Sequence, residues 1–242
     1  MKKLRAVGVI PARFASTRFP GKLLANLNRR PVLEWAYLSA KKSKVFERIL
    51  IATDDYRILR ATANFGAEAV LTNPKHPSGT DRIAEVARKI NCDIVVNLQG
   101  DHPFISPKML RELLGSFADK KVQVATLAYP ERDAKKLKNP NLVKTVFDKD
   151  NFALYFSRST IPWEAEEAFV HIGLYAFRKN FLLNLVHKKP TPLEKVEKLE
   201  QLRILENGNP IKVVLTKEAV PSIDVPEDLR AAQSWAKKRG WI

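Results

Sequence analysis

The chain has 242 residues, of which 45% are hydrophobic and one, Cys92, is a cysteine, and no linker, repeat or low-complexity tract divides it. We therefore expect one domain over residues 1–242 with a sizeable buried core, and the single cysteine excludes an internal disulfide and a multi-cysteine zinc site. The formal charge of +16 invites a nucleic-acid hypothesis, but the lysine and arginine clusters are short and dispersed, so we expect no specific nucleic-acid partner.

Short apolar runs alternate with amphipathic stretches through the first half of the chain. This alternation is typical of βαβ units around a mostly parallel sheet. The expected strands lie at residues 6–10, 48–53, 68–71, 94–98 and 122–128, and the expected helices at 31–42, 55–65, 80–90 and 107–117. The sequence therefore predicts an α/β fold with a mostly parallel, Rossmann-like sheet flanked by helices.

The pattern changes in the second half, where three strands follow one another at residues 143–147, 153–156 and 170–177. These predict a small antiparallel excursion that covers one end of the sheet. The segment from Thr191 to Glu194 has the chemistry of a helix start, with a capping threonine and a proline at the first helical position. We expect that helix to end near residues 207–208 and a last helix to begin at Pro226, just after Asp224.

No segment of the chain is typical of a membrane or secreted protein. No apolar run approaches the roughly 20 residues that span a bilayer. The first residues also lack the apolar core and the cleavage site of a secretory signal. We therefore expect a cytoplasmic protein without a membrane span.

The loop after the first expected strand has the composition of an anion-binding site. Its cations, hydroxyls and glycine are Arg13, Ser16, Thr17, Arg18, Gly21 and Lys22. Guanidinium groups, hydroxyls and an open backbone suit phosphate oxygens, and loops at the carboxyl ends of strands are where open α/β sheets bind ligands. A solvated basic loop is the alternative, and composition alone leaves it open.

The order of residues in this loop resembles the nucleotide-binding loop of the 3-deoxy-manno-octulosonate cytidylyltransferases, also called CMP-Kdo synthetases. Further blocks of that family have similar segments here, in the same order and along nearly the whole chain. They are SGTDR at 78–82, VNLQGD at 96–101, ALYFSRSTIPW at 153–163, LEQLR at 199–203 and DVPEDL at 224–229. One block would be weak evidence, whereas this many in register make the resemblance strong.

The resemblance implies a nucleotidyltransferase that forms CMP-Kdo and pyrophosphate from CTP and Kdo, for lipopolysaccharide biosynthesis. It also implies a homodimer, with residues 143–180 forming the sugar side and a dimer contact. Attack at the α-phosphorus builds negative charge on phosphoryl oxygens, so such an enzyme relies on positioning, cations and Mg²⁺.

The same resemblance assigns the phosphate and metal chemistry to four residues. Arg13 and Lys22 would neutralise the triphosphate, supported by Arg18 and the loop amides. Asp101 and Asp224 would hold Mg²⁺, which prefers carboxylate oxygens. From the residues alone, the cap of a turn or helix is the favoured interpretation of each aspartate, and the resemblance reverses it.

Binding of CTP is expected from two loops and one strand end. Beyond Arg13, Arg18 and Lys22, the residues concerned are Ser16, Thr17, Ser78, Gly79, Asp81, Arg82 and Gln99. Ser78 or Thr80 can also be the N-cap of the following helix with Asp81 as its capping-box partner. The two roles are compatible.

The family's sugar-acid pocket aligns with Gln99, Arg158, His171, Tyr175, Glu200 and Gln201. Arg158 would bind the carboxylate of the sugar, and the others its hydroxyls. Each has a structural alternative: His171 a hydrogen-bonded strand residue, Tyr175 a core residue, and Glu200 the partner of a basic side chain on the same helix.

The chain departs from the family in two places, one beside the expected metal ligand Asp101 and one at the lip of the sugar pocket. His102 stands where many members have glutamate, and the segment between Trp163 and His171 is short. The rival functions are CMP transfer to a related acidic sugar, such as an amino analogue of Kdo or a sialic acid, and a basic nucleic-acid-binding protein.

Overall fold

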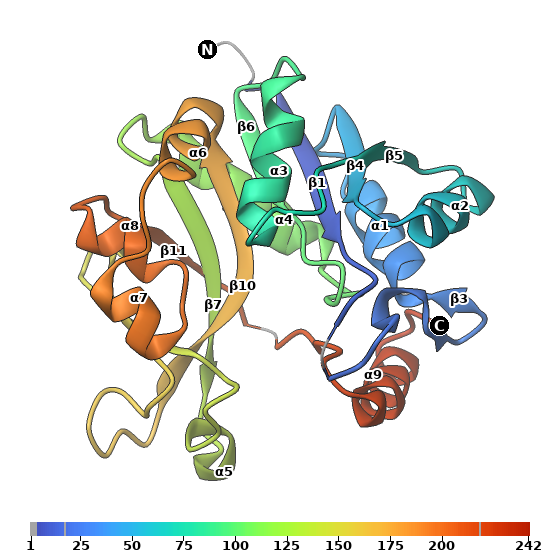
Figure 1. Ribbon diagram of the computed structural model, residues 1–242. Coiled ribbons are helices and arrows are strands. Elements are labelled where there is room, and N and C mark those ends of the chain that lie inside the picture. The colour runs from blue at the N-terminus through green and yellow to red at the C-terminus, as the bar shows by residue number, and fades with distance from the viewer. Residues whose placement is uncertain (1–3, 17, 218) are drawn as a thin grey trace. The chain divides into compact units, whose positions relative to one another are not determined.

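The computed structural model describes residues 4–16, 18–217 and 219–242, which belong to two compact units (Figure 1). The first unit comprises residues 1–111 and 220–242, and the second comprises residues 112–219. Whether the two units fold as one domain stays a prediction. Among the described residues, none of the helices is both long and apolar enough to cross a bilayer.

The first unit contains a parallel sheet in the order β6-β1-β4-β5. Its strands are β1 (Ala6–Ala12), β4 (Arg48–Thr53), β5 (Glu68–Leu71) and β6 (Ile94–Asn97). The first five residues of β1 and all of β6 are buried, as expected for central parallel strands that are covered on both faces. The order of the strands reverses between β1 and β6, and ligands of open α/β sheets bind at such a switch point.

Helices connect these strands. They are α1 (Val32–Lys42), α2 (Tyr56–Asn64) and α3 (Gly79–Arg88), and Figure 1 shows α3 in front of β1. Right-handed crossovers place α3 on the opposite face of the sheet from α1 and α2. The unit also has a short helix η1 (Lys22–Leu24), a hairpin of β2 (Asn26–Leu27) and β3 (Arg30–Pro31), and the last helix α9 (Pro226–Lys238). α4 (Pro107–Gly115) carries the chain into the second unit.

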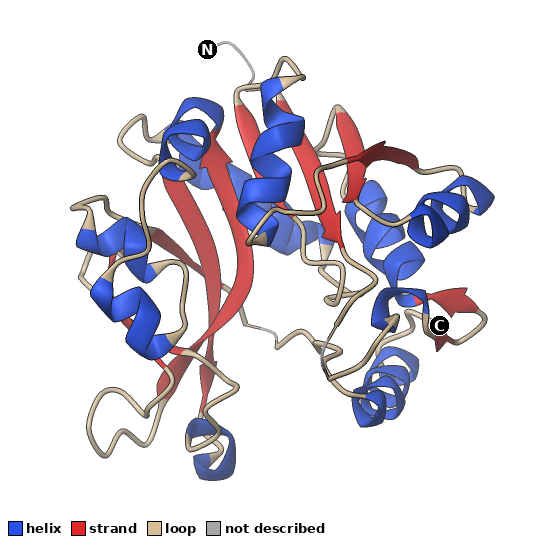
Figure 2. Cartoon of the chain, viewed as in Figure 1, coloured by secondary structure: helices blue, strands red, loops and turns tan. Residues whose placement is uncertain are grey.

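The second unit is built largely on antiparallel strands (Figure 2). β7 (Val124–Glu131) pairs antiparallel with β10 (Ala168–Arg178) and parallel with β11 (Lys212–Leu215). β8 (Lys144–Phe147) pairs antiparallel with β10 and with β9 (Ala153–Ser157). Its helices are η2 (Ser116–Ala118), α5 (Ala134–Leu137), α6 (Lys179–Leu185), α7 (Pro192–Glu197) and α8 (Leu202–Glu206).

These elements confirm the predicted α/β class, with a parallel sheet in the first half and an antiparallel excursion in the second. The single helix predicted from Thr191 to residues 207–208 is wrong. α7 does begin at Pro192, where Glu194 accepts a hydrogen bond from the Thr191 N–H at 3.1 Å, but Lys198 has a left-handed backbone with φ 55° and ends it. The chain then starts again as α8.

Candidate active site

A pocket of about 430 Å³ lies at the carboxyl ends of β1 and β6 in the first unit. Its walls come from the loop after β1, the start of α3, the turn after β6 and the segment before α9. The predicted residues that line it are Arg13, Ser16, Arg18, Lys22, Ser78, Gly79, Gln99, Asp101 and Asp224. The pocket therefore gathers most of the predicted phosphate, base and metal residues at the switch point of the sheet.

Lys22 lies between the two predicted metal ligands. Its Nζ is 2.6 Å from Asp101 Oδ2 and 3.2 Å from Asp224 Oδ1. Arg18 also donates to Asp224 Oδ1, at 2.9 Å. Burial lowers the pKa of Lys22, but the two carboxylates outweigh burial and raise it above its ordinary value. Lys22 is therefore a charged ammonium at neutral pH.

The pair of carboxylates fits a magnesium ion. Asp101 and Asp224 converge on one cation, the Lys22 ammonium, so their oxygens can approach a common centre. Hard carboxylate oxygens are ligands that Mg²⁺ accepts, and it usually binds through one or two carboxylates together with water and substrate phosphates. Within the described ranges no group of three His, Cys, Asp or Glu side chains is placed to hold a metal, so His102 adds no third ligand.

Three hydrogen bonds from backbone N–H groups fix Asp224 beside Asp101. Ile223 N–H donates to the carbonyl of Asp101 at 2.9 Å. Asp228, in the first turn of α9, accepts from the N–H groups of Asp224 and Val225 at 2.8 and 3.0 Å. The start of α9 and the turn after β6 are thus joined directly, which sets the spacing of the two carboxylates.

The start of α3 forms a second wall of the pocket. Ser78 is its N-cap, accepting from Asp81 N–H at 3.2 Å and donating to Asp81 Oδ2 at 2.7 Å. Free N–H groups at a helix N-terminus attract anions. Arg13 donates to the carbonyl of His76 at 2.6 Å, which ties the loop after β1 to the loop before α3.

Two of the predicted CTP-binding residues that the structure describes, Asp81 and Arg82, do not line this pocket, and Thr17 lies outside the described residues. Asp81 pairs with Ser78 at the start of α3. Arg82 is completely buried, and its guanidinium donates to Asp54 at 2.7 Å and to Thr72 at 2.5 Å. Direct contact of Arg82 with CTP is therefore not a feature of this pocket, because a buried charge needs its partners and Asp54 supplies one.

Glu85 supports the loop before α3. It accepts from Asn73 N–H at 2.9 Å and lies 2.7 Å from His76 Nε2. Burial raises the pKa of the Glu85 carboxyl, but the hydrogen bonds from Asn73, His76 and Lys89 outweigh it and lower the pKa to about 2. The ionised carboxylate therefore stabilises the fold.

This depressed pKa predicts a pH dependence of stability. The contribution of Glu85 to the free energy of unfolding is complete above the pKa of about 4.3 that its carboxyl has in the unfolded chain. This contribution is lost as the pH falls toward the folded-state pKa of about 2. We expect Glu85→Gln to lower the free energy of unfolding at pH 7 and to lower it less at about pH 3. Urea unfolding at both pH values measures this. Glu68→Gln, at an exposed ion pair with Arg48, is the control, and an equal loss for Glu85→Gln at both pH values would contradict the prediction.

In the second unit, His171 and Tyr175 lie on β10 at either side of a register shift against β7. Thr126 holds this irregular segment: its hydroxyl lies 2.9 Å from His171 Nε2 and 2.8 Å from the carbonyl of Leu174. Tyr175 Oη is buried with no hydrogen-bond partner among the described residues. Burial raises the pKa of Tyr175 well above its ordinary value, so the phenol is a neutral donor.

Arg158 lies at the end of β9 among backbone carbonyls. Its guanidinium donates to the carbonyls of Glu197, Pro140 and Lys198 at 2.8, 3.0 and 3.3 Å. Among the described residues these bonds use three of the five N–H donors of the guanidinium, so two further donors can serve an anion. Of the remaining predicted sugar residues, Gln201 is buried and Glu200 is partly exposed.

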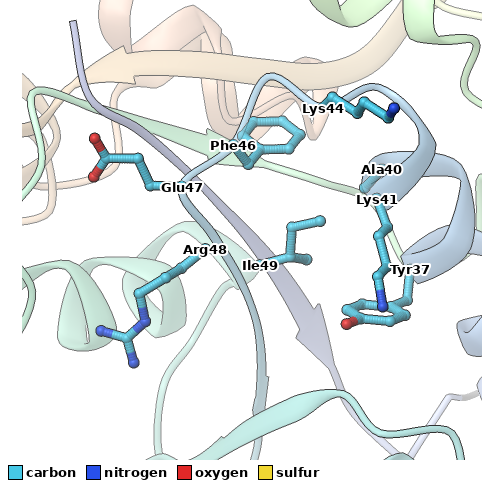
Figure 3. Close-up of a pocket in the computed structure, with 8 residues that line it drawn as sticks. All are labelled: Tyr37, Ala40, Lys41, Lys44, Phe46, Glu47, Arg48 and Ile49. Atoms are coloured by element: carbon cyan, nitrogen blue, oxygen red, sulfur yellow. The ribbon is translucent and has the colours of Figure 1, made fainter.

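A second pocket of the first unit, of about 190 Å³, lies at the start of β4 (Figure 3). Lys41 Nζ is 5.6 Å from the centre of the Tyr37 ring, which it covers. Arg48 and Glu47 point away from the space between Phe46 and Ile49. The charged groups of this pocket do not converge on a common point, in contrast to those around Lys22.

Sequence reasoning missed several residues that shape the site. Pro11, Ala15, Leu23 and Gly100 line the first pocket. A Cβ added to Gly100 would come within 3.2 Å of a methyl group of Leu23, so the close approach of the turn after β6 to η1 favours glycine there. Thr126 had no sequence signal, because its role depends on the pairing of β7 with β10.

The comparisons with known proteins agree with this geometry. A family model described as cytidylyltransferase matches residues 7–215. The 3-deoxy-manno-octulosonate cytidylyltransferase of Thermodesulfovibrio yellowstonii is 44% identical, over 93% of this chain and 95% of that protein. The protein of the same name from Leptospira biflexa is 45% identical, over 98% of each chain.

Two solved structures extend the comparison. A CMP:2-keto-3-deoxy-manno-octonic acid synthetase complexed with CTP superposes with a TM-score of 0.92 at 37% identity, covering 97% of this chain and 99% of that one. A 4-diphosphocytidyl-2C-methyl-D-erythritol synthase of Anaerococcus prevotii has a TM-score of 0.67 at 14% identity, over 98% of this chain and 100% of that one. The second likeness concerns the fold alone.

Proposed function

The chain belongs to the 3-deoxy-manno-octulosonate cytidylyltransferase family, and we propose that it transfers CMP from CTP to Kdo and releases pyrophosphate, for lipopolysaccharide biosynthesis. The observation that supports this most is the convergence of Lys22, Asp101 and Asp224 in a pocket that also contains Arg13 and the start of α3. Cations, helix N–H groups and paired carboxylates in one pocket suit a nucleoside triphosphate with its metal.

In this reaction a hydroxyl oxygen of the sugar acid attacks the α-phosphorus of CTP. The bond from that phosphorus to the bridging oxygen breaks, pyrophosphate leaves with the electron pair, and the proton of the attacking hydroxyl passes to water. Arg13, Arg18 and Lys22 neutralise the charge on the phosphoryl oxygens, and Ser16 and the amides at the start of α3 donate hydrogen bonds to them. Mg²⁺, held by Asp101 and Asp224, would supply a Lewis acid that polarises the phosphoryl oxygens and lowers the pKa of the attacking hydroxyl.

We assign the cytidine to the wall formed by Ser78, Gly79 and Gln99, which line the pocket. Asp81 holds the Ser78 hydroxyl, and Arg82 orders the chain before α3 through Thr72 and Asp54. Both are therefore proposed as positioning residues. Thr17 keeps its proposed place among the residues that bind the triphosphate.

For the sugar acid we propose the second-unit residues Arg158, His171, Tyr175, Glu200 and Gln201, together with Gln99. The two free donors of Arg158 suit a carboxylate. The buried Tyr175 hydroxyl without a described partner and the imidazole oriented by Thr126 suit hydroxyl groups of a polyol. A site built to bond those hydroxyls would discriminate strongly against sugars that lack them.

Replacement of Arg158 tests this assignment. We expect Arg158→Ala to raise the KM for Kdo by about tenfold or more, because a charge-assisted contact to the carboxylate is lost, while the Kd for CTP stays unchanged. Steady-state kinetics and titration calorimetry measure the two effects. Arg132→Ala, which removes an exposed arginine of the same unit, is the matched control. Loss of CTP binding with retained affinity for Kdo would refute the assignment of Arg158 to the sugar acid.

We further propose a cytoplasmic homodimer that uses Mg²⁺. Residues 143–180, the proposed sugar side, also form the proposed dimer contact. Leu154 and Trp163 in this segment are 64% and 86% exposed, and large exposed apolar side chains support an interface there.

Release of pyrophosphate tests the proposed function. The purified protein is given CTP and Mg²⁺ with Kdo, with an amino analogue of Kdo, with a sialic acid or with no sugar. We expect release with Kdo only. Faster release with the amino analogue or the sialic acid would favour the rival acceptor, and no release from a folded sample with any sugar would refute the reaction.

A further inference from the structure

The loop that carries the pocket cations is folded around Phe14. Gly21 N–H donates to the carbonyl of Phe14 at 3.0 Å, which closes the loop at its base. Gly21 has φ 72°, and a Cβ on it would lie 3.1 Å from Cζ of the Phe14 ring. The ring therefore rests directly on the glycine backbone, and a larger residue at 21 would displace it.

Arg57, in the first turn of α2, packs on the same ring. Its guanidinium carbon lies 3.3 Å from the centre of the Phe14 ring. Asp55 fixes the guanidinium, since its carboxylate accepts from Nε at 2.9 Å and from a terminal nitrogen at 2.5 Å, and it also caps α2 by accepting from the Arg57 N–H. A guanidinium held in a fork of this kind has little freedom left to leave the ring.

We propose that Arg57 is a positioning residue for the nucleotide triphosphate: by packing on Phe14, whose ring contacts Gly21, it holds the loop that carries the pocket cations in its binding shape before the nucleotide arrives. Arg57 is not among the residues that line the pocket. Its effect passes through Phe14 to the loop, which carries Arg13, Ser16, Arg18 and Lys22. A loop that is already ordered loses less conformational entropy when it binds a ligand.

This inference rests on the proposed function, because it concerns the same triphosphate site. A competing explanation is that Arg57 attracts the triphosphate by charge alone. Its side chain is 62% exposed, and an exposed charge at a distance is screened by salt. Arg60 separates the two explanations, because it is an exposed arginine one turn further along α2 with the same charge.

The experiment is calorimetric titration of the whole protein with CTP and Mg²⁺ in the absence of sugar. We expect Arg57→Ala to raise the Kd for CTP about fivefold, the loss of one cation–π contact, and Arg60→Ala to raise it less than about twofold. Arg57→Lys keeps the charge but not the planar fork, so an intermediate value is expected. Equal effects of Arg57→Ala and Arg60→Ala would overturn the inference. If the wild-type protein itself does not bind CTP, the proposed function fails as well.

Two further readouts follow the loop itself. Trypsin can cut after Arg13, Arg18 and Lys22, and we expect faster cleavage there in Arg57→Ala than in Arg60→Ala, because an ordered loop resists proteolysis. In a Phe14→Leu background, Arg57→Ala should change the Kd for CTP by less than about twofold, since the two residues act as one contact. Unchanged cleavage, or a full effect of Arg57→Ala without the Phe14 ring, would show that Arg57 does not act through the loop.

Discussion

Asp101→Asn and Asp224→Asn are each expected to leave the fold intact and to lower turnover by about 100-fold or more, a loss typical of removing one electrostatic contact to a transition state. Asparagine has the size of aspartate without its charge. Each change therefore removes one charged oxygen ligand for Mg²⁺ and one partner of the Lys22 ammonium. The measurement is steady-state pyrophosphate release with CTP, Kdo and a moderate concentration of Mg²⁺.

Asp119→Asn is the matched control for both variants. Asp119 is an exposed residue of the second unit outside residues 143–180, and its Oδ1 accepts from the Lys121 N–H at 2.8 Å, a bond that asparagine can keep, so its replacement is expected to leave turnover unchanged. Near-normal turnover of Asp101→Asn and Asp224→Asn would contradict the assignment of the two carboxylates to the metal.

Phe104→Ala is expected to cost about 3–5 kcal/mol in the free energy of unfolding, because a buried aromatic side chain is lost and a cavity remains. Phe104 is 1% exposed, and its ring centre lies 5.4 to 5.7 Å from those of Trp35, Trp235 and Trp241. Two of these tryptophans come from the C-terminal segment, so the contact holds α9 onto the first unit. Urea unfolding followed by tryptophan fluorescence measures the loss.

Phe104→Leu serves as the conservative comparison, since leucine fills much of the space and should cost less. A loss below about 1 kcal/mol for Phe104→Ala would contradict this role, because it is typical of exposed positions. The cluster also bears on the site: Phe104 follows Asp101 by three residues, and α9 begins directly after Asp224 and Val225. The less destabilised Phe104→Leu variant can therefore be tested for a higher requirement for Mg²⁺.

Local sequence patterns were sufficient to predict the elements that depend on neighbouring residues, such as apolar runs and helix caps. The apolar run of β1 and the capping residues before α3 and α7 predicted those elements close to where the structure has them. β11 and the hairpin of β2 and β3 were missed, since they are very short and are defined by pairing with distant or adjacent strands. The break at Lys198 was missed because lysine in a left-handed conformation carries no sequence signal.

The candidate site also contains residues that could be predicted from the sequence and contacts that could not. The resemblance to a family predicted the residues that the pocket brings together, among them Arg13, Lys22 and Asp101. It did not predict that Asp54 pairs with Arg82, nor that backbone carbonyls take three donors of Arg158. These contacts join segments far apart in the sequence, so they depend on the folded chain.

The most direct test of the central claim is a ³¹P NMR spectrum of the wild-type protein with CTP, Mg²⁺ and Kdo. The account predicts that the triphosphate resonances disappear while one phosphodiester resonance and that of pyrophosphate grow in equal molar amounts, and that Asp101→Asn shows neither within the same time. A triphosphate that persists with the wild-type protein, or that is hydrolysed to free CMP without a phosphodiester, would contradict it.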